Sequence, residues 1–277
     1  MKKILLTGAT GFVGKKILSA LNEANVSIIP VVRSGKEAQL DGFTKVKKIV
    51  SSPNIFIESI DWWHMQCQGI DTIIHSAWFT EPGKYLESSQ NIECLIGSLN
   101  LAQGAALAGV KKFVGIGTCF EYDLKCRVLS KNTPLNPSTL YAGTKCSLFT
   151  GLSHYLSNKK IDFAWCRLFY LYGEGEDERR LVPYLHKQLS NGNPVELTSG
   201  KQIRDFLDVT VAGERIVKVA LSKLKGPINI CSGSPITVKQ IAEMIADQYG
   251  RRDLLKFGLR QDNLVDPPCV LGITEHF

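Results

Sequence analysis

The stretch KKILLTGATGFVGKKILSALNEA, residues 2–24, decides the fold. A short apolar strand pattern runs into three glycines spaced three apart, Gly8, Gly11 and Gly14, and a helical pattern begins at Phe12. Glycines at such a turn let the backbone approach a pyrophosphate, and the start of a helix offers free N–H groups and a partial positive charge. The stretch therefore predicts a dinucleotide-binding turn. We expect this turn to be formed by Gly8, Thr10, Gly11, Phe12, Val13 and Gly14.

Strand and helix patterns alternate through the first two thirds of the chain. Short apolar runs predict strands, and apolar residues spaced three and four apart predict helices. This alternation predicts a doubly wound α/β fold, in which helices cover both faces of a parallel sheet. The expected strands are residues 2–7, 26–32, 45–50, 71–77, 111–117 and 162–166, and the expected helices are about 12–24, 85–108 and 138–156.

The pattern changes after Phe169, where residues 170–180 are polar, glycine-rich and charged. Further helix patterns follow at about 181–189, 209–224 and 236–249, with a turn at 191–194. We assign residues 1–169 to a dinucleotide-binding domain and residues 170–277 to a smaller substrate-binding region, with about 206–230 returning to the first domain. Ligands of such sheets bind at the C-terminal strand edges, where this second region would pack.

Composition narrows the class of protein. The 277 residues carry a net charge of +7 and 44% hydrophobic residues, which is ordinary for a globular protein. The basic residues are scattered, which argues against a nucleic-acid partner. No apolar run approaches the length of a membrane span, and MKKILL is too short for a signal peptide. Eight cysteines without a C-x-x-C pair indicate reduced thiols of a cytoplasmic protein.

No metal site is expected from the histidines. Their spacing does not match known ligand patterns. The four that we considered are His64, His154, His186 and His276.

The end of the second expected strand bears on the choice of cofactor. An acidic residue there would accept the 2′-OH of NAD, but the sequence reads VVRSGK. Arg33, with Ser34 and Lys36, suits a 2′-phosphate instead. We therefore predict NADP, with NAD as the alternative. Asn54 and Ile55 follow the third expected strand, where this fold approaches the adenine.

A tyrosine and a lysine lie four positions apart in STLYAGTK, residues 138–145. On a helix Tyr141 and Lys145 would be neighbours on one face. A nearby ammonium lowers the pKa of a phenol and makes it a usable acid or base. The alternative is a chance pair on a helix face.

Six motifs, in order over nearly the whole chain, resemble the extended short-chain dehydrogenase/reductases. More narrowly they resemble the nucleotide-sugar branch of NAD-dependent epimerases and dehydratases. The resemblance implies a Rossmann fold, a nicotinamide cofactor and a nucleotide-sugar substrate. The motifs are GATGFVG (8–14), IIHSAW (73–78), GTCFEY (117–122), YAGTK (141–145), RLFYLYG (167–173) and IRDFLDV (203–209).

The resemblance also implies residue roles. Tyr141 would be the catalytic acid or base, Lys145 would lower its pKa and bind the nicotinamide ribose, and Thr118 would hydrogen-bond the reacting oxygen. Arg204 would pair with the substrate diphosphate. The remaining cofactor contacts would be His75, Ser76 and Ala77, and the remaining substrate contacts Trp78, Cys119 and Tyr170. In the charged stretch GEGEDERR, residues 173–180, either Arg179 or Arg180 is expected to reach the nucleotide phosphates.

The chain departs from the family pattern at several positions. Dehydratases of this branch follow the catalytic threonine with Asp-Glu, but here Cys119 and Phe120 stand there, so dehydration is not expected. Glu121 is interpreted as a polar loop residue. Cys94 takes the place of a common asparagine, and whether Asn91 replaces it stays open. Tyr170 stands where many epimerases carry an asparagine.

We therefore expect an NADPH-dependent reductase of a keto group on a nucleotide-activated sugar, with a 4-keto-6-deoxy sugar as the leading candidate. An NAD-dependent nucleotide-sugar epimerase is the alternative, and a non-catalytic NADP-binding sensor or scaffold is an alternative of another class. The helices at about 85–108 and 138–156 would pair two copies into a homodimer.

Overall fold

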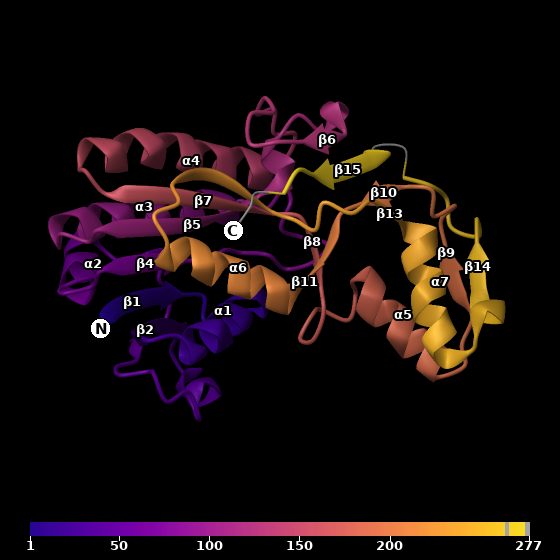
Figure 1. The fold of residues 1–277 in the computed structure, drawn as a ribbon, viewed down its shortest axis with the longest axis horizontal. Helices are drawn as coiled ribbons and strands as arrows, with labels where there is room; N and C mark the ends of the chain where they lie inside the picture. Colours follow the sequence, from indigo (N-terminus) through magenta and orange to yellow (C-terminus); the bar gives the residue numbers. More distant parts are fainter. Residues whose placement is uncertain (264–265, 275–277) are drawn as a thin grey trace.

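The structure is a computed structural model that describes residues 1–263 and 266–274 (Figure 1). His276 lies outside the described residues. No described helix is long and apolar enough to cross a bilayer. No cluster of three or more potential metal ligands occurs among the described side chains.

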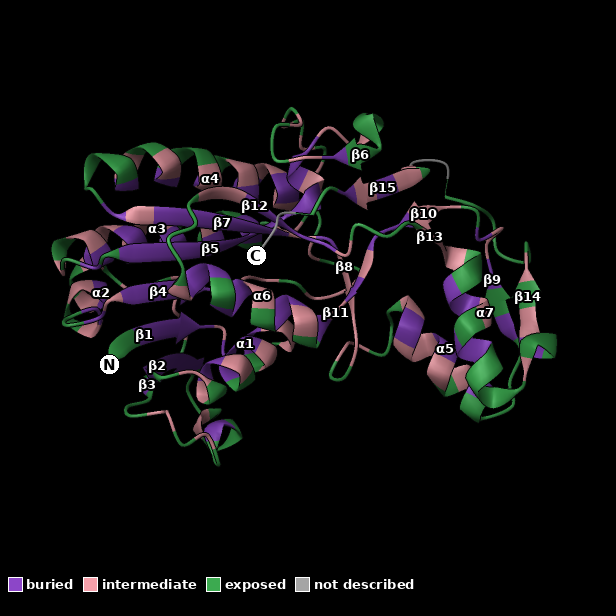
Figure 2. Cartoon of the chain, viewed as in Figure 1, coloured by how far each residue is buried: buried purple, intermediate pink, exposed green. Residues whose placement is uncertain are grey.

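The larger part of the molecule is built on one sheet of seven parallel strands. The strands are β1 (Lys2–Thr7), β2 (Val26–Arg33), β3 (Val50–Ser52), β4 (Thr72–His75), β5 (Lys112–Thr118), β7 (Asp162–Leu168) and β12 (Gly226–Ile230). Their order in the sheet is β12-β7-β5-β4-β1-β2-β3 (Figure 2). The order switches between β1 and β4, and such a switch point opens a crevice at the C-terminal strand ends.

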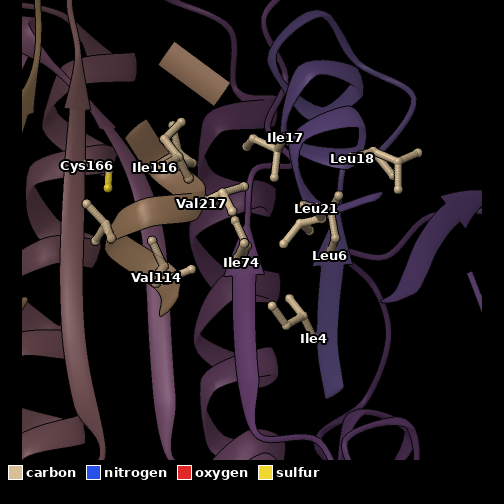
Figure 3. Packing of buried hydrophobic residues seen from close by; sticks show 14 of the residues in the cluster. Ile4, Leu6, Ile17, Leu18, Leu21, Ile74, Val114, Ile116, Cys166 and Val217 are labelled. Carbon is tan, nitrogen blue, oxygen red and sulfur yellow. The ribbon is translucent and has the colours of Figure 1, made fainter. Parts of the chain in front are cut away.

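Helices cover both faces of this sheet. On one face α1 (Phe12–Glu23) and α6 (Val209–Leu221) pack against Ile4 and Leu6 of β1 (Figure 3). On the other face α2 (Ile60–Gln66), α3 (Gln90–Leu107) and α4 (Leu140–Asn158) pack against Leu5. Adjacent strand residues point to opposite faces, so β1 contributes to both cores. The predicted doubly wound fold is confirmed.

A smaller lobe lies beyond the C-terminal ends of the strands (Figure 1). It contains α5 (Leu181–Ser190), α7 (Val238–Tyr249) and the parallel pair β9 (Val195–Leu197) and β14 (Leu255–Phe257). These elements enclose a core of their own, which Figure 2 shows as buried faces turned toward one another. A capping box between Thr237 and Gln240 begins α7, and left-handed Gly250 ends it.

Short strands join the lobe to the main body. β8 (Tyr170–Tyr172) pairs with β11 (Phe206–Asp208). A second small sheet combines β13 (Ile236–Thr237), β10 (Ile203–Arg204), β15 (Cys269–Gly272) and β6 (Val128–Leu129). The 3-10 helices are η1 (Glu37–Leu40), η2 (Cys119–Glu121), η3 (Leu124–Cys126) and η4 (Arg252–Leu254). After β11 the chain returns to the main body as α6 and β12.

The third strand, β12 and the start of α3 differ from the sequence prediction. The third strand is Val50–Ser52 rather than residues 45–50, and Val46 makes only an isolated bridge with Ile28. β12 was not predicted, because its five residues have no periodicity of their own. Helix α3 begins at Gln90 rather than near residue 85, because the Asn91 side chain donates to the carbonyls of Tyr85 and Ser88 and closes the preceding turns.

Candidate active site

The turn between β1 and α1 has the shape that a pyrophosphate needs. Gly8 has a left-handed backbone with φ of 72°, and a Cβ on Gly14 would lie 1.9 Å from the Gly8 carbonyl oxygen. Only glycine permits this close packing of turn and helix. Gly11 begins α1 without a side-chain cap, so N–H groups of the first helical turn remain available to an anion. These features fit the pyrophosphate of NAD(P).

One cavity of about 830 Å³ extends from this turn along the strand ends to the smaller lobe. It is large enough for a dinucleotide and part of a substrate. His75 and Arg179, both in the described part of the chain, are not among its lining residues. The predicted residues that line it are Gly8, Thr10, Gly11, Phe12, Val13, Gly14, Arg33, Asn54, Ile55, Ser76, Ala77, Trp78, Thr118, Cys119, Tyr141, Lys145, Tyr170 and Arg204.

Thr118, Tyr141 and Lys145 meet at the middle of the cavity. Thr118 ends β5, whereas Tyr141 and Lys145 lie one turn apart in the first turns of α4. The Thr118 side chain lies close enough to the phenol of Tyr141 to lower its pKa, against the effect of burial. Lys145 Nζ donates to the carbonyl of Ile116 at 2.7 Å and lies 3.7 Å from the ring centroid of Trp78. The sequence prediction that these groups come together therefore holds in the geometry, while their catalytic roles stay predictions.

The pKa of Tyr141 departs from the sequence expectation. Burial raises it above the ordinary value of a tyrosine, although part of the ring faces the cavity, and the neighbouring Tyr85 raises it further. The net shift is opposite to the lowering expected from Lys145, because burial dominates and the Lys145 ammonium is directed at Ile116 and Trp78. Burial lowers the pKa of Lys145 to about 7, against the opposing influence of Glu121. Tyr141 is thus an undissociated acid at neutral pH.

His75 lies behind the cavity as a buried neutral group. Ser98 donates its hydroxyl to the Cys94 carbonyl, so its oxygen accepts from His75 Nε2 at 2.7 Å. His75 Nδ1 then accepts from the Thr7 hydroxyl at 2.8 Å. The tautomer is assigned from this chain of hydrogen bonds. Burial lowers the pKa of His75 to about 3. A direct contact of His75 with the cofactor stays a prediction.

Asn91 has a supporting role that the sequence left open. Its side-chain oxygen accepts from the indole N–H of Trp78 at 2.8 Å, and its amide group closes the turns before α3. Asn91 therefore holds the ring that lies over Lys145. Burial raises the pKa of Cys94 to about 11, so this thiol is uncharged at neutral pH.

At the far end of the cavity Arg204 is the main basic group. It is buried, its guanidinium donates to Asp266 at 2.6 Å, and it lies 5.2 Å from the ring centroid of Tyr170. Arg179 is exposed and bonded to Asp177, whereas its neighbour Arg180 lines the cavity. The sequence did not single out several other lining residues because no motif marks them. They include Ser52, Phe56, Tyr85 and Leu181.

The burial of Glu121 contradicts its interpretation as a polar loop residue. It is fully buried and forms an ion pair with Arg167, with 2.7 Å between Oε2 and Nε. The reason is tertiary, because Arg167 comes from β7, which pairs with β5. A single carboxylate in a loop motif carries no local signal of such a partner.

Comparisons with known proteins agree with this geometry. The profile described as "NAD dependent epimerase/dehydratase family" matches residues 4–231. The chain therefore belongs to the NAD-dependent epimerase/dehydratase family. It is a nucleotide-sugar-modifying, NAD(P)-dependent enzyme of the extended short-chain dehydrogenase/reductase type, as the resemblance of its motifs predicted.

Two curated relatives span nearly the whole chain. One is dTDP-6-deoxy-L-talose 4-dehydrogenase (NAD(+)) of Aggregatibacter actinomycetemcomitans, 23% identical over 97% of this chain and 98% of the relative. Another is CDP-abequose synthase of Salmonella muenchen, 24% identical over 96% of this chain and 88% of the relative.

Solved structures confirm the fold. UDP-N-acetylglucosamine 4-epimerase of Methanobrevibacter ruminantium M1, in complex with UDP-N-acetylmuramic acid, superposes with a TM-score of 0.84 at 23% identity. The match covers 99% of this chain and 89% of that one.

Proposed function

We propose that this enzyme uses NADPH to reduce the keto group of a nucleotide-activated 4-keto-6-deoxy sugar. The observation that carries the proposal is the meeting of Thr118, Tyr141 and Lys145 in the cavity that begins at the glycine turn. When bound, NADPH supplies the hydride. One relative is named as a 4-dehydrogenase of a dTDP-6-deoxy sugar, and the proposed reaction is the reductive direction of that chemistry.

Tyr141 would deliver the proton. Its raised pKa keeps the phenol protonated, so it can donate to the oxygen that gains negative charge as the hydride arrives. Thr118, which lines the same cavity, would hold the same oxygen. Lys145, when protonated, would stabilise the phenolate left behind and bind the nicotinamide ribose. General acid catalysis of this kind contributes about 10²- to 10⁴-fold to a rate.

The preference for NADPH rests on the end of β2. Arg33 and Lys36 both line the cavity there, and both suit a 2′-phosphate. NAD remains the competing cofactor, because one relative and several similar structures carry NAD in their names.

Reduction is favoured over dehydration by the residues after Thr118. Cys119 is buried, and burial raises the pKa of its thiol above the ordinary value, so it is a poor base. Phe120 cannot transfer a proton. At the substrate end Arg204 and Arg180 would bind the diphosphate, which requires that the phosphate displace Asp266 from Arg204.

The experiment is a substrate panel. Purified enzyme is mixed with NADPH and with dTDP-, CDP-, GDP- and UDP-activated 4-keto-6-deoxy sugars, and loss of NADPH absorbance is followed. We expect one equivalent of NADPH to be consumed per sugar reduced with at least one nucleotide. If no member of the panel consumes NADPH or NADH, the proposed reaction is wrong.

The same panel separates the alternatives. An epimerase, which the similar epimerase structures favour, would retain tightly bound NAD through purification and interconvert sugars without net consumption. A sensor or scaffold would bind NADPH and consume none with any sugar.

We also propose a homodimer formed through α3 and α4. Helix α3 exposes Ile92 and Ile96, which are 42% and 53% accessible. Pairing of these helices between two copies would cover them. A monomeric mass by light scattering at micromolar concentration would contradict this. The buried thiols of Cys67 and Cys166 suit a reducing compartment, so we place the enzyme in the cytoplasm.

A further inference from the structure

Glu121 occupies a site built for a buried carboxylate directly behind Thr118. Its Oε1 accepts from the Thr118 backbone N–H at 2.8 Å, its Oε2 accepts from Arg167 Nε at 2.7 Å, and both oxygens lie 3.0 Å from Trp165 Nε1. Gly117 leaves the space, because a Cβ there would lie 2.4 Å from Glu121 Oε1. A carboxylate with several N–H donors is strongly stabilised in its charged form.

The Glu121–Arg167 ion pair connects to the rest of the molecule in two directions. Toward the cavity, Glu121 accepts from the backbone N–H of Thr118, and Thr118 lines the cavity together with Tyr141. Away from the cavity, Arg167 donates to the Tyr122 hydroxyl at 3.1 Å, and Tyr122 donates to Asn229 at 2.8 Å. The first direction leads to the reacting groups and the second to the core beside β12.

Glu121 also acts on the charge of Lys145. Trp165 lies between them, since its indole N–H contacts Glu121 while its ring centroid is 5.9 Å from Lys145 Nζ. The ionisable groups that interact with the charge of Lys145 are Glu121 from η2, Cys94 from α3 and His75 from β4. Of these, Cys94 and His75 are uncharged at neutral pH, so the negative charge comes from Glu121.

We propose that Glu121 is a positioning residue of the reaction, which holds the backbone of Thr118 in place and supplies the buried negative charge on the far side of Trp165 from the Lys145 ammonium. The proposal rests on the proposed function of Thr118, Tyr141 and Lys145. Glu121 touches neither the cavity nor a ligand within it, since it is fully buried and is not one of the cavity-lining residues. The competing explanation is a purely structural ion pair, which would affect stability alone.

The test compares Glu121→Gln with Tyr122→Phe. The first variant removes the negative charge at nearly constant shape, and the second removes a hydrogen bond of the same network without changing charge. The Lys145 ammonium is titrated by NMR in ligand-free enzyme containing carbon-13-labelled lysine, and its signal is assigned with Lys145→Arg. We expect the pKa of Lys145 to fall by about one unit in Glu121→Gln and to stay unchanged in Tyr122→Phe.

Turnover supplies the second measurement. Loss of the negative charge makes Lys145 lose its proton at lower pH, so the basic limb of the kcat profile should move down by the same amount. At pH values above the basic limb, kcat of Glu121→Gln should be about tenfold lower than that of wild type. An unchanged Lys145 pKa in Glu121→Gln, or an equal shift in Tyr122→Phe, overturns the proposal.

Glu121→Gln leaves Arg167 without its anion and can prevent folding. The double variant Glu121→Gln/Arg167→Met is therefore titrated as well, and the Lys145 pKa should again fall, by a smaller amount. A rise of the Lys145 pKa in the double variant contradicts the proposal. The titration needs no sugar, so failure of the substrate panel with an intact Lys145 shift would refute the proposed reaction and leave the role of Glu121 standing.

Discussion

The two ends of the cavity are built in different ways. The cofactor end rests on the ends of long parallel strands and on backbone groups, at Gly8, Gly14 and Thr118. The substrate end rests on strands of two or three residues and on side chains such as Tyr170 and Arg204. A change at the first end disturbs the main chain, whereas the second end can change by single side-chain replacements. We therefore expect the sheet to hold the cofactor and the smaller lobe to select the sugar nucleotide.

The ion pairs of the main body and of the smaller lobe also differ, in how far they are buried. In the main body the ion pair of Glu121 and Arg167 is buried, with 0% and 1% of the side chains exposed. In the lobe the pairs Arg251–Asp253 and Arg252–Asp247 lie at the surface. Exposed pairs contribute at most about 1 kcal/mol to stability, while losing one partner of a buried pair costs about 3–5 kcal/mol.

The largest effect is expected at the centre of the cavity. Tyr141→Phe removes the proton donor and should lower kcat by about 10³-fold, while NADPH affinity changes little. Tyr155→Phe on the same helix, outside the cavity lining, is the matched control and should keep kcat. Steady-state kinetics and equilibrium NADPH binding check both variants. Full activity of Tyr141→Phe would remove the catalytic assignment.

The cofactor end is tested next by Arg33→Asp. An aspartate repels the 2′-phosphate of NADPH and can accept the 2′-OH of NADH, so NADPH affinity should fall about 10- to 100-fold while NADH affinity holds or improves. Lys47→Asp makes the same change of charge at an exposed position outside the cavity lining and should leave the ratio unchanged. Fluorescence titration with both cofactors measures the ratio. Equal loss for both cofactors would mean that Arg33 does not read the phosphate.

A pH dependence of stability should come from the main body through His75. Its folded pKa is about 3, below the unfolded value of 6.5. Between these values the unfolded chain binds a proton that the folded protein does not. The free energy of unfolding should therefore fall as the pH drops from about 6.5 toward 3, by up to about 1.4 kcal/mol per pH unit from this residue.

Denaturant unfolding at several pH values measures how the free energy of unfolding changes with pH in wild type and in His75→Gln. This dependence on pH should be weaker in His75→Gln, whatever the absolute stability of the variant. His154→Gln, at an exposed position of α4, is the control and should keep the wild-type dependence on pH. The same dependence on pH in wild type and His75→Gln would show that His75 is not held neutral.

The smallest effect is expected in the lobe. Arg252→Ala removes the exposed pair with Asp247 and should lower the melting temperature only slightly. Thermal unfolding at low and high salt checks this, and the difference from wild type should shrink as salt increases. A loss as large as that expected for a buried pair would erase the contrast between the two regions.

The sequence predicted much of the fold because its signals are local. Strand and helix periodicity, the glycine turn and the spacing of Tyr141 and Lys145 all lie within stretches of about twenty residues, and the resulting fold class is confirmed. The predicted start of α3 was wrong because the Asn91 side chain donates hydrogen bonds to carbonyls that precede the helix. The pKa direction of Tyr141 was wrong because desolvation depends on what surrounds the phenol, which no pair spacing reveals.

By itself the sequence determined the doubly wound sheet, the dinucleotide turn and the set of candidate catalytic residues, since each depends on neighbours in the chain. Tertiary structure alone decided which distant groups meet. Glu121 and Arg167 are 46 positions apart, and Thr7 and His75 are 68 apart. Both pairs form because parallel pairing of β5 with β7 and of β1 with β4 places their strand ends side by side. The physical reason is that strand order depends on the packing of the whole sheet, whereas strand and turn signals depend on a few adjacent residues.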